Sequence, residues 1–224
     1  MGATSLFLRA VPAPSDWEGA RATPAALIRA RIFDAITRAV AEKGYAATTV
    51  ADITARCRIS RRTFYEHFAD KETCFLGAYE SASMATLESI AQATAPIAAT
   101  EWQERLRVAL ETYVGILAED PELAQVTLID ILGAGPRALV MREDVLERYT
   151  DFYRRLSARA SHSGAVTPVP DVFLRGLVGA IAEIIQRELL ADRARELPQL
   201  VPTFVQLTLT VFGDRSTVGA LGRC

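Results

Sequence analysis

Four arginines lie close together near residue 60 and form the sharpest chemical feature of the sequence. Arg56, Arg58, Arg61 and Arg62 fall within seven residues, with no acidic residue among them. A guanidinium can donate two parallel hydrogen bonds to guanine O6 and N7, or it can pair with a phosphate. The cluster therefore suggests recognition of nucleic acid, while a solvated charged surface is the simple alternative.

Two short helices are expected to position these arginines. Thr49 is predicted to cap a helix over 50–57, with Asp52 as its capping-box partner. Ser60 is predicted to cap a second helix over 61–68, after a three-residue turn.

Longer helices are expected on both sides of this pair. Apolar residues at helical spacing predict a helix over 25–43 that ends at Gly44, and Asp70 is predicted to cap a long helix that ends near residue 95. Two short helices joined by a tight turn inside a three-helix unit are typical of a helix-turn-helix. The second helix of that motif enters a major groove about 12 Å wide, with its N-terminal residues facing the bases.

Residues 28–80 resemble the DNA-binding domain of the TetR family of bacterial transcriptional regulators, over about a quarter of the chain. The matching residues are Arg31-Ile32-Phe33-Asp34-Ala35, Glu42-Lys43-Gly44-Tyr45, Thr48-Thr49-Val50-Ala51-Asp52-Ile53, Ile59-Ser60-Arg61-Arg62-Thr63-Phe64-Tyr65, His67-Phe68 and Asp70-Lys71-Glu72. Many positions match in order and at the right spacing, which makes the resemblance specific.

The resemblance implies base contacts from the start of the second short helix and phosphate contacts around it. The expected DNA-binding residues are Thr49, Ser60, Arg61, Arg62, Thr63, Tyr65, His67 and Lys71. Among them, Arg61, Arg62 and Thr63 would face bases.

The chain departs from the family pattern at two positions. The family usually has glycine where this chain has Arg58, and a small residue where it has Arg62. A left-handed backbone at Arg58 would cost about 1 kcal/mol relative to glycine. The added charges suggest guanine-rich recognition or tighter contact with the DNA backbone.

Five further helices are expected after residue 95, so the predicted fold class is all-α with about nine helices. They span 102–119, 122–132, 137–161, 171–193 and 197–212. The predicted domains are a flexible arm (1–24), a three-helix helix-turn-helix domain (25–70), a C-terminal helical ligand-binding and dimerisation domain (71–213) connected to it by helix 70–95, and a tail (214–224).

The helices over 171–193 and 197–212 are apolar on two sides, so each must be buried on two sides. A second subunit could cover one side, although a central position in a monomeric bundle would also explain the pattern. The resemblance favours a homodimer, and therefore a near-palindromic operator. The expected interface residues are Leu174, Leu177, Val178, Ile181, Ile185, Leu200, Phe204, Leu207 and Val211.

The resemblance also implies a small-molecule effector, bound between the DNA-binding domain and the last two helices. Candidate pocket residues are Trp102, Tyr113, Met141, Tyr149, Phe152 and Tyr153, for which ordinary core packing is the alternative.

Composition and charge exclude several other classes of protein. With two histidines, no phosphate loop and no nucleophile motif, the sequence offers little to build an enzyme from. The spacing of the three cysteines matches no metal site and suggests a reducing cytoplasm, and no cofactor or metal is expected. No apolar run is long enough to span a membrane.

The net charge of −2 is an average over a basic and an acidic part. Residues 1–80 carry a net charge of +2, and the remainder carries −4. The sequence thus predicts a dimeric, ligand-released transcriptional repressor that binds double-stranded DNA. A DNA-binding regulator controlled by a partner protein, or acting without a ligand, is the alternative.

Overall fold

The structure is a computed structural model that describes residues 23–98, 100–162, 164, 166 and 168–213. Every regular element in these ranges is a helix, as predicted. The described residues fall into two compact units, one up to Thr86 together with Asp120–Arg142, the other Leu87–Glu119 together with the residues from Glu143 onward. The predicted arm, except for its last two residues, and the predicted tail lie outside the described residues.

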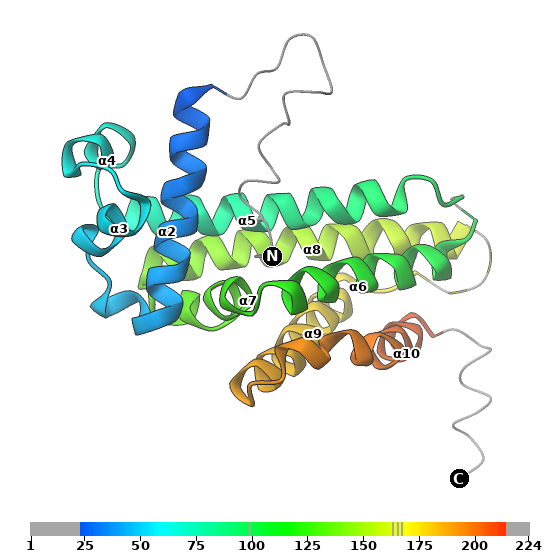
Figure 1. Cartoon of the computed structure of the whole chain (residues 1–224). Helices are drawn as coiled ribbons and strands as arrows, with labels where there is room; N and C mark the ends of the chain where they lie inside the picture. Colours follow the sequence, from blue (N-terminus) through cyan, green and yellow to red (C-terminus); the bar gives the residue numbers. More distant parts are fainter. Residues whose placement is uncertain (1–22, 99, 163, 165, 167, 214–224) are drawn as a thin grey trace. The chain divides into compact units, whose positions relative to one another are not determined.

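The first unit contains the helix-turn-helix (Figure 1). Its complete elements are α2 (Pro24–Ala47), α3 (Val50–Cys57), α4 (Arg61–His67), α7 (Pro121–Leu128) and the 3-10 helix η1 (Asp130–Gly133). The beginnings of α5 (Lys71–Thr94) and α8 (Pro136–His162) complete it. Helix α2 packs against α3, α7 and η1, so it is the central element of this unit.

Apolar residues at helical spacing explain this packing. On α2, Ile32, Ile36 and Val40 are fully buried. In the helix-turn-helix, Phe64 of α4 and Phe68 directly after it are also buried. Their rings lie 5.8 Å apart between centroids. The short helices are therefore anchored through one face each.

Local signals set the helix ends as predicted. Thr49 and Asp52 form a reciprocal capping box at the start of α3, and the Ser60 hydroxyl caps α4. The Asp70 carboxylate accepts a hydrogen bond from the Thr73 amide at 2.7 Å. Gly44 has φ of +78°, which interrupts α2 where the stop was expected, although helical backbone resumes as far as Ala47.

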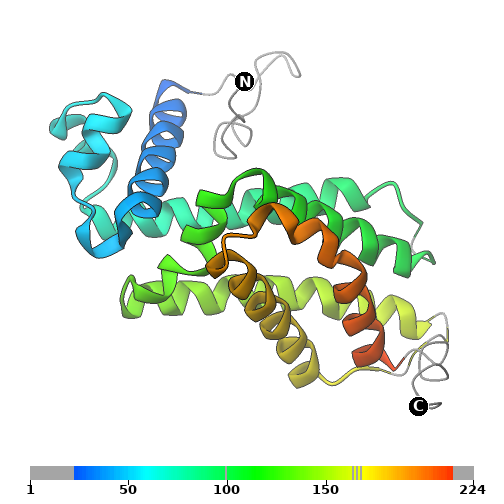
Figure 2. The same cartoon turned by 60° about the horizontal axis from the view of Figure 1, so that its bottom comes forward.

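The second unit is built from the remaining helices (Figure 2). Its complete elements are α6 (Trp102–Glu119), α9 (Asp171–Leu190), the 3-10 helix η2 (Ala194–Leu200) and α10 (Val201–Phe212), joined by the ends of α5 and α8. Both α6 and α9 pack against η2 and α10. None of the helices in the described ranges is long and apolar enough to cross a membrane.

Two predicted helices are split in the structure. The helix expected over 122–132 is α7 followed by η1, and the helix expected over 197–212 is η2 followed by α10. Pro198 lies inside η2 and Pro202 is the second residue of α10, which explains why no continuous α-helix forms there.

Six of the nine predicted dimer residues are already less than 8% exposed within the single chain. They are Leu174, Leu177, Val178, Ile181, Ile185 and Phe204. The other three, Leu200, Leu207 and Val211, are half-buried. The apolar side of α9 faces its own unit rather than outward.

Candidate nucleic-acid interface

Helix α4 presents three of the predicted DNA-binding side chains to solvent. Arg61, Arg62 and Tyr65 are exposed, whereas Phe64 on the opposite side is fully buried. Tyr65 is 55% exposed despite its large ring, which packs edge-on against Phe64 with centroids 5.4 Å apart. His67 is half-buried at the end of the helix. The outward face of α4 thus combines two guanidinium groups with a phenol.

The small hydroxyl residues of α4 are bonded to the helix itself. Ser60 Oγ accepts a hydrogen bond from the Thr63 amide at 3.0 Å and lies 2.9 Å from Thr63 Oγ1. These contacts fix the N-terminus of α4. A DNA contact from either hydroxyl would be additional to this capping role.

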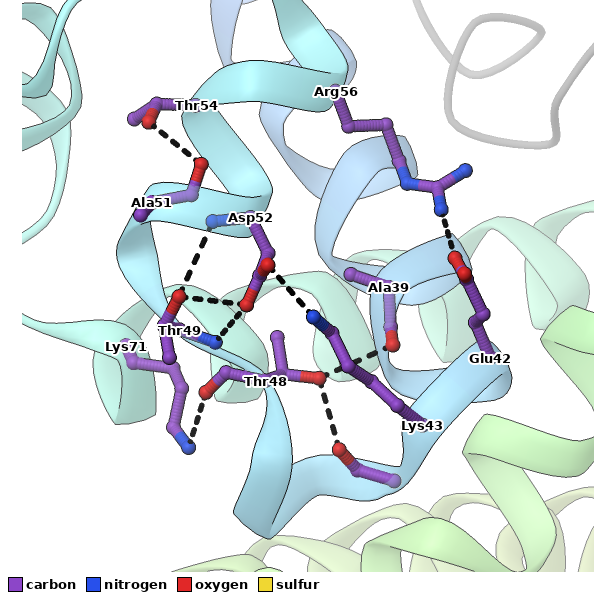
Figure 3. A network of polar contacts seen from close by, with 11 residues as sticks. Ala39, Glu42, Lys43, Thr48, Thr49, Ala51, Asp52, Thr54, Arg56 and Lys71 are labelled. Atoms are coloured by element: carbon purple, nitrogen blue, oxygen red, sulfur yellow. Dashed lines mark hydrogen bonds and ion pairs between the residues drawn. The ribbon is translucent and has the colours of Figure 1, made fainter.

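The start of α3 is held by a polar network that joins it to α2 and α5 (Figure 3). The Thr49 amide donates to Asp52 Oδ2 at 2.8 Å, and Lys43 Nζ lies 2.7 Å from Asp52 Oδ1. Hydrogen bonds from Lys43 and Thr49 hold the pKa of the Asp52 carboxyl well below its usual value. The carboxylate is therefore charged in the folded protein at neutral pH.

Lys71 lies in the same network, and its ammonium is largely engaged inside the protein. Its Nζ donates to the Tyr45 and Thr48 carbonyls at 2.7 and 2.9 Å and lies 4.2 Å from the centroid of the Tyr45 ring. Burial lowers the pKa of this amine. Lys71 thus satisfies carbonyl groups at the end of α2, and the predicted phosphate contact would have to share the ammonium with them.

The arginines of the cluster differ in what they contact. Arg56 is ion-paired with Glu42, and Arg62 Nε lies 3.1 Å from Glu66 Oε1. The side chains of Arg58 and Arg61 are exposed and have no hydrogen-bond or ion-pair partner among the described residues.

Arg58 has the left-handed conformation that its position in the sequence suggested. Its φ and ψ are 53° and 50°. The next amide, of Ile59, donates to the Thr54 carbonyl at 3.1 Å, a bond that closes helix C-termini of this kind. The turn between α3 and α4 therefore demands this backbone, and arginine adopts it at a cost of about 1 kcal/mol relative to glycine.

Sequence reasoning missed two arginines of α2 that hold the ends of the short helices. Arg31 donates to the Cys57 carbonyl, the last of α3, at 2.7 Å. Arg29 reaches the His67 carbonyl at the end of α4 at 3.5 Å and lies over the Phe68 ring at 4.6 Å. Both contacts span more than 20 residues, and the only signal in the sequence is that these arginines lie off the apolar stripe of α2.

A second missed feature ties α2 to α7. The Arg38 guanidinium bonds both carboxylate oxygens of Asp120 at 2.5 Å and also reaches Glu122 at 2.9 Å. Asp120 caps α7 at the same time. This bidentate pair fixes α7 against the helix-turn-helix within the first unit.

The candidate pocket residues do not all fall in one unit. Met141 belongs to the first unit, and the other five belong to the second. Within the second unit, Trp102 is buried and stacks on Phe212, and Tyr153 is buried in the core. Half-buried side chains remain at Tyr113, Tyr149 and Phe152.

Comparison with known proteins agrees with this geometry. Residues 32–78 match the model of the family described as bacterial regulatory proteins, tetR family. An uncharacterised HTH-type transcriptional regulator, YerO of Bacillus subtilis, is 46% identical over 50 residues. That stretch spans 22% of this chain and 17% of YerO.

Solved structures extend the likeness to the whole fold. FadR of Bacillus subtilis, solved in complex with stearoyl-CoA, has a TM-score of 0.73 at 19% identity, over 81% of this chain and 97% of that one. SmeT, the repressor of the Stenotrophomonas maltophilia multidrug efflux pump SmeDEF, has a TM-score of 0.68 at 20% identity, over 82% and 89%. The helix-turn-helix segment, residues 32–78, is therefore similar to the DNA-binding domain of the tetR family of bacterial regulatory proteins, and the fold of the chain is similar to the folds of FadR and SmeT.

Proposed function

We propose that the protein is a transcriptional repressor that binds a near-palindromic operator as a homodimer and leaves it when a small-molecule effector binds. The observation that supports DNA binding best is the outward face of α4, on which Arg61, Arg62 and Tyr65 are exposed. A helix anchored on one face and cationic on the other meets the requirements for entry into a major groove.

A gel shift with DNA from upstream of the protein's own gene tests this proposal. The wild-type protein should shift that DNA in the presence of excess unrelated duplex, and Arg61→Ala should weaken the shift. Arg107→Ala is the matched control, because Arg107 is an exposed arginine of α6 outside the helix-turn-helix. Failure of the wild-type protein to prefer any upstream fragment over unrelated DNA would contradict the proposal.

Dimerisation is proposed through the side of α9 that its own unit leaves uncovered. Val172 and Phe173 at the start of α9 and Leu190 at its end are 59–74% exposed. Between them, Gly176 and Gly179 have open space around their α-carbons. Large apolar groups flanking small residues would allow two copies of α9 to approach closely. The half-buried Leu207 and Val211 of α10 remain candidates for the same interface.

The effector site is proposed in the second unit, near the half-buried aromatic residues. The Tyr113 and Tyr149 rings lie 5.4 Å apart between centroids, and Phe152 follows one turn later on α8. A ligand with a long apolar part would suit such a lining. Since FadR was solved with stearoyl-CoA, acyl-CoA esters of different chain length are the first probes to try.

Release of bound operator by these probes tests the effector proposal. An acyl-CoA that binds should release the DNA and raise the melting temperature of the free protein, whereas coenzyme A alone is the control for the headgroup. Tyr149→Leu should weaken the response, and Leu139→Ala, at an exposed position in the first unit, should not. Release by a partner protein but by no small molecule would favour the alternative mode of control.

A further inference from the structure

Arg58 adopts a backbone conformation that its side chain does nothing to stabilise. It has φ of 53°, and among non-glycine residues in the described part of the chain only Asp192, with φ of 57°, shares a positive φ. Aspartate is one of the few residue types that tolerate this region, and arginine is not. Glycine would satisfy the turn without strain, so the turn itself does not require arginine here.

Hydrogen bonds to the backbone of the turn fix the left-handed conformation of Arg58. The Arg58 amide donates to the Ala55 carbonyl at 3.4 Å, and the Ile59 amide donates to the Thr54 carbonyl at 3.1 Å. The Arg31 guanidinium donates a hydrogen bond to the Cys57 carbonyl at 2.7 Å. None of these bonds uses the Arg58 side chain, which is exposed and has no partner among the described residues.

Apart from Arg61, which α4 already presents toward the bases in the proposed function, the neighbouring cations behave differently. Lys43, Arg56 and Arg62 each pair with a carboxylate, and Lys71 donates to two carbonyl groups. Each of these groups would have to give up or share an internal contact to bind an external anion. The Arg58 guanidinium has no such contact to lose, and its strain is the kind that recurs at functional sites.

We infer that Arg58 is an additional DNA-binding residue, and that its guanidinium pairs with a backbone phosphate at the edge of the groove that α4 enters. The position follows from the motif, because the bases face the first residues of α4 and Arg58 lies in the turn just before them. A phosphate contact adds affinity for every sequence and no base preference. The inference rests on the proposed function, since it presupposes that α4 binds DNA.

Replacement of Arg58 by glycine distinguishes a structural role of the residue in the turn from a role in DNA binding. Arg58→Gly removes both the charge and the strain, so the melting temperature should rise by about 2–4 °C. DNA affinity should fall for the operator and for unrelated duplex alike. Two phosphate contacts are lost per dimer, so the slope of log K against log salt should decrease in magnitude by about 1.8. At 0.15 M salt, the same loss corresponds to roughly 10- to 30-fold weaker binding.

Arg58→Asn checks that glycine flexibility does not cause the effect, because asparagine tolerates the left-handed region and carries no charge. Asp192→Gly is the control for strain, since it relieves a similar φ in the second unit and should leave DNA binding unchanged. Arg56→Ala is the control for charge, because Arg56 is already paired with Glu42 and its loss should leave the salt slope near the wild-type value.

The deciding experiment is a titration of the full-length protein into labelled operator and unrelated duplex at several salt concentrations, alongside melting curves. Equal loss of affinity for both duplexes, a shallower salt slope and a higher melting temperature in Arg58→Gly and Arg58→Asn would support the phosphate contact. Wild-type affinity and slope in both variants would overturn it, and so would a loss confined to the operator. If the wild-type protein bound no DNA at all, the proposed function itself would fail.

Discussion

At the scale of single residues, the ion pairs of the helix-turn-helix are on the surface and are therefore weak. Arg62 remains 90% exposed while it contacts Glu66. Exposed pairs of this kind contribute about 0–1 kcal/mol, so Arg62 can leave Glu66 for a base edge at little cost. The pair keeps the guanidinium along α4 in the free protein without preventing its use in DNA recognition.

Replacement of Arg62 by alanine tests its role as a base-reading residue. We expect Arg62→Ala to weaken operator binding by about 1–3 kcal/mol and to relax the preference at one base position in each half-site. Binding to a set of operators with single substitutions measures both effects, with Arg107→Ala as the control. A uniform loss over all sequences would instead make Arg62 a phosphate contact.

The Asp52 carboxylate makes the stability of this domain sensitive to acid. Its pKa is lowered from the ordinary value of 3.8 by hydrogen bonds from Lys43 and Thr49, and the pKa of Asp70 is lowered by the Thr73 amide. A carboxyl group whose folded pKa is depressed stabilises the fold above the ordinary pKa and loses that contribution as the pH falls below it. Stability should therefore begin to fall below about pH 4.

Melting temperatures between pH 5 and pH 3 measure this effect in the wild-type protein and in Asp52→Asn. The amide cannot titrate, so the variant should start from a lower melting temperature at pH 5 and lose less of it toward pH 3. Parallel curves for the two proteins would show that another group controls the acid response.

Residue roles that depend on local sequence were predictable, and those that depend on distant contacts were not. The caps at Thr49 and Ser60 follow from neighbours within four positions, and the structure confirms both. The left-handed Arg58 was suggested by the glycine that the resembling family usually has at this position, and the structure shows that conformation. By contrast, the carbonyl partners of Lys71 and Arg31 lie 23 and 26 residues away in the chain. Spacing along one helix contains no information about such partners.

At the scale of elements, α2 positions both short helices of the motif. Arg31 bonds the end of α3, and Arg29 bonds the end of α4 and lies over the Phe68 ring. Charged groups at helix C-termini satisfy carbonyls that otherwise lack partners. The orientation of α4 therefore depends on the polar edge of α2 as well as on its apolar stripe.

Loss of the Arg31 bond should loosen the turn before α4. We expect Arg31→Ala to destabilise the protein by about 1–2 kcal/mol, because the Cys57 carbonyl loses its charged donor. Operator affinity should fall while the salt slope stays at the wild-type value, because Arg31 orients α4 and touches no phosphate in this account. A reduced slope in salt titrations would place Arg31 on the DNA instead.

The element boundaries that the sequence misplaced lie at prolines and at 3-10 segments. Apolar spacing over 122–132 and over 197–212 fits one continuous helix, whereas the structure divides each into a 3-10 and an α-helical part. Periodicity reports which side of a segment is buried but does not distinguish 3.0 from 3.6 residues per turn over so few residues.

At the scale of the whole molecule, the predicted dimer surface illustrates what apolar patterning cannot resolve. Of the nine interface residues expected on α9, η2 and α10, six are buried by the chain itself. A pattern of apolar residues does not say whether the covering element belongs to the same chain or to a partner. The exposed Phe173 and the small residues after it are the better candidates for the interface.

Substitution of Phe173 tests the proposed assembly. Phe173→Glu places a charge on the uncovered side of α9 and should convert the dimer to monomers, as measured by light scattering. Operator binding should weaken as well, because a monomer binds only one half-site at a time. Val140→Glu, at a position 65% exposed on α8, is the control and should remain dimeric. A variant at Phe173 that stays dimeric would place the interface elsewhere.

The most direct test of the account is selection of bound sequences from a random double-stranded DNA library by the full-length protein. For the wild-type protein we predict enrichment of one near-palindromic motif whose half-sites are separated by about one helical turn of DNA or a multiple of it. Selection with Arg62→Ala should change the preferred base at one position in each half-site. Recovery of no enriched motif by a folded, dimeric wild-type protein would contradict the assignment of α4 as a DNA-reading helix.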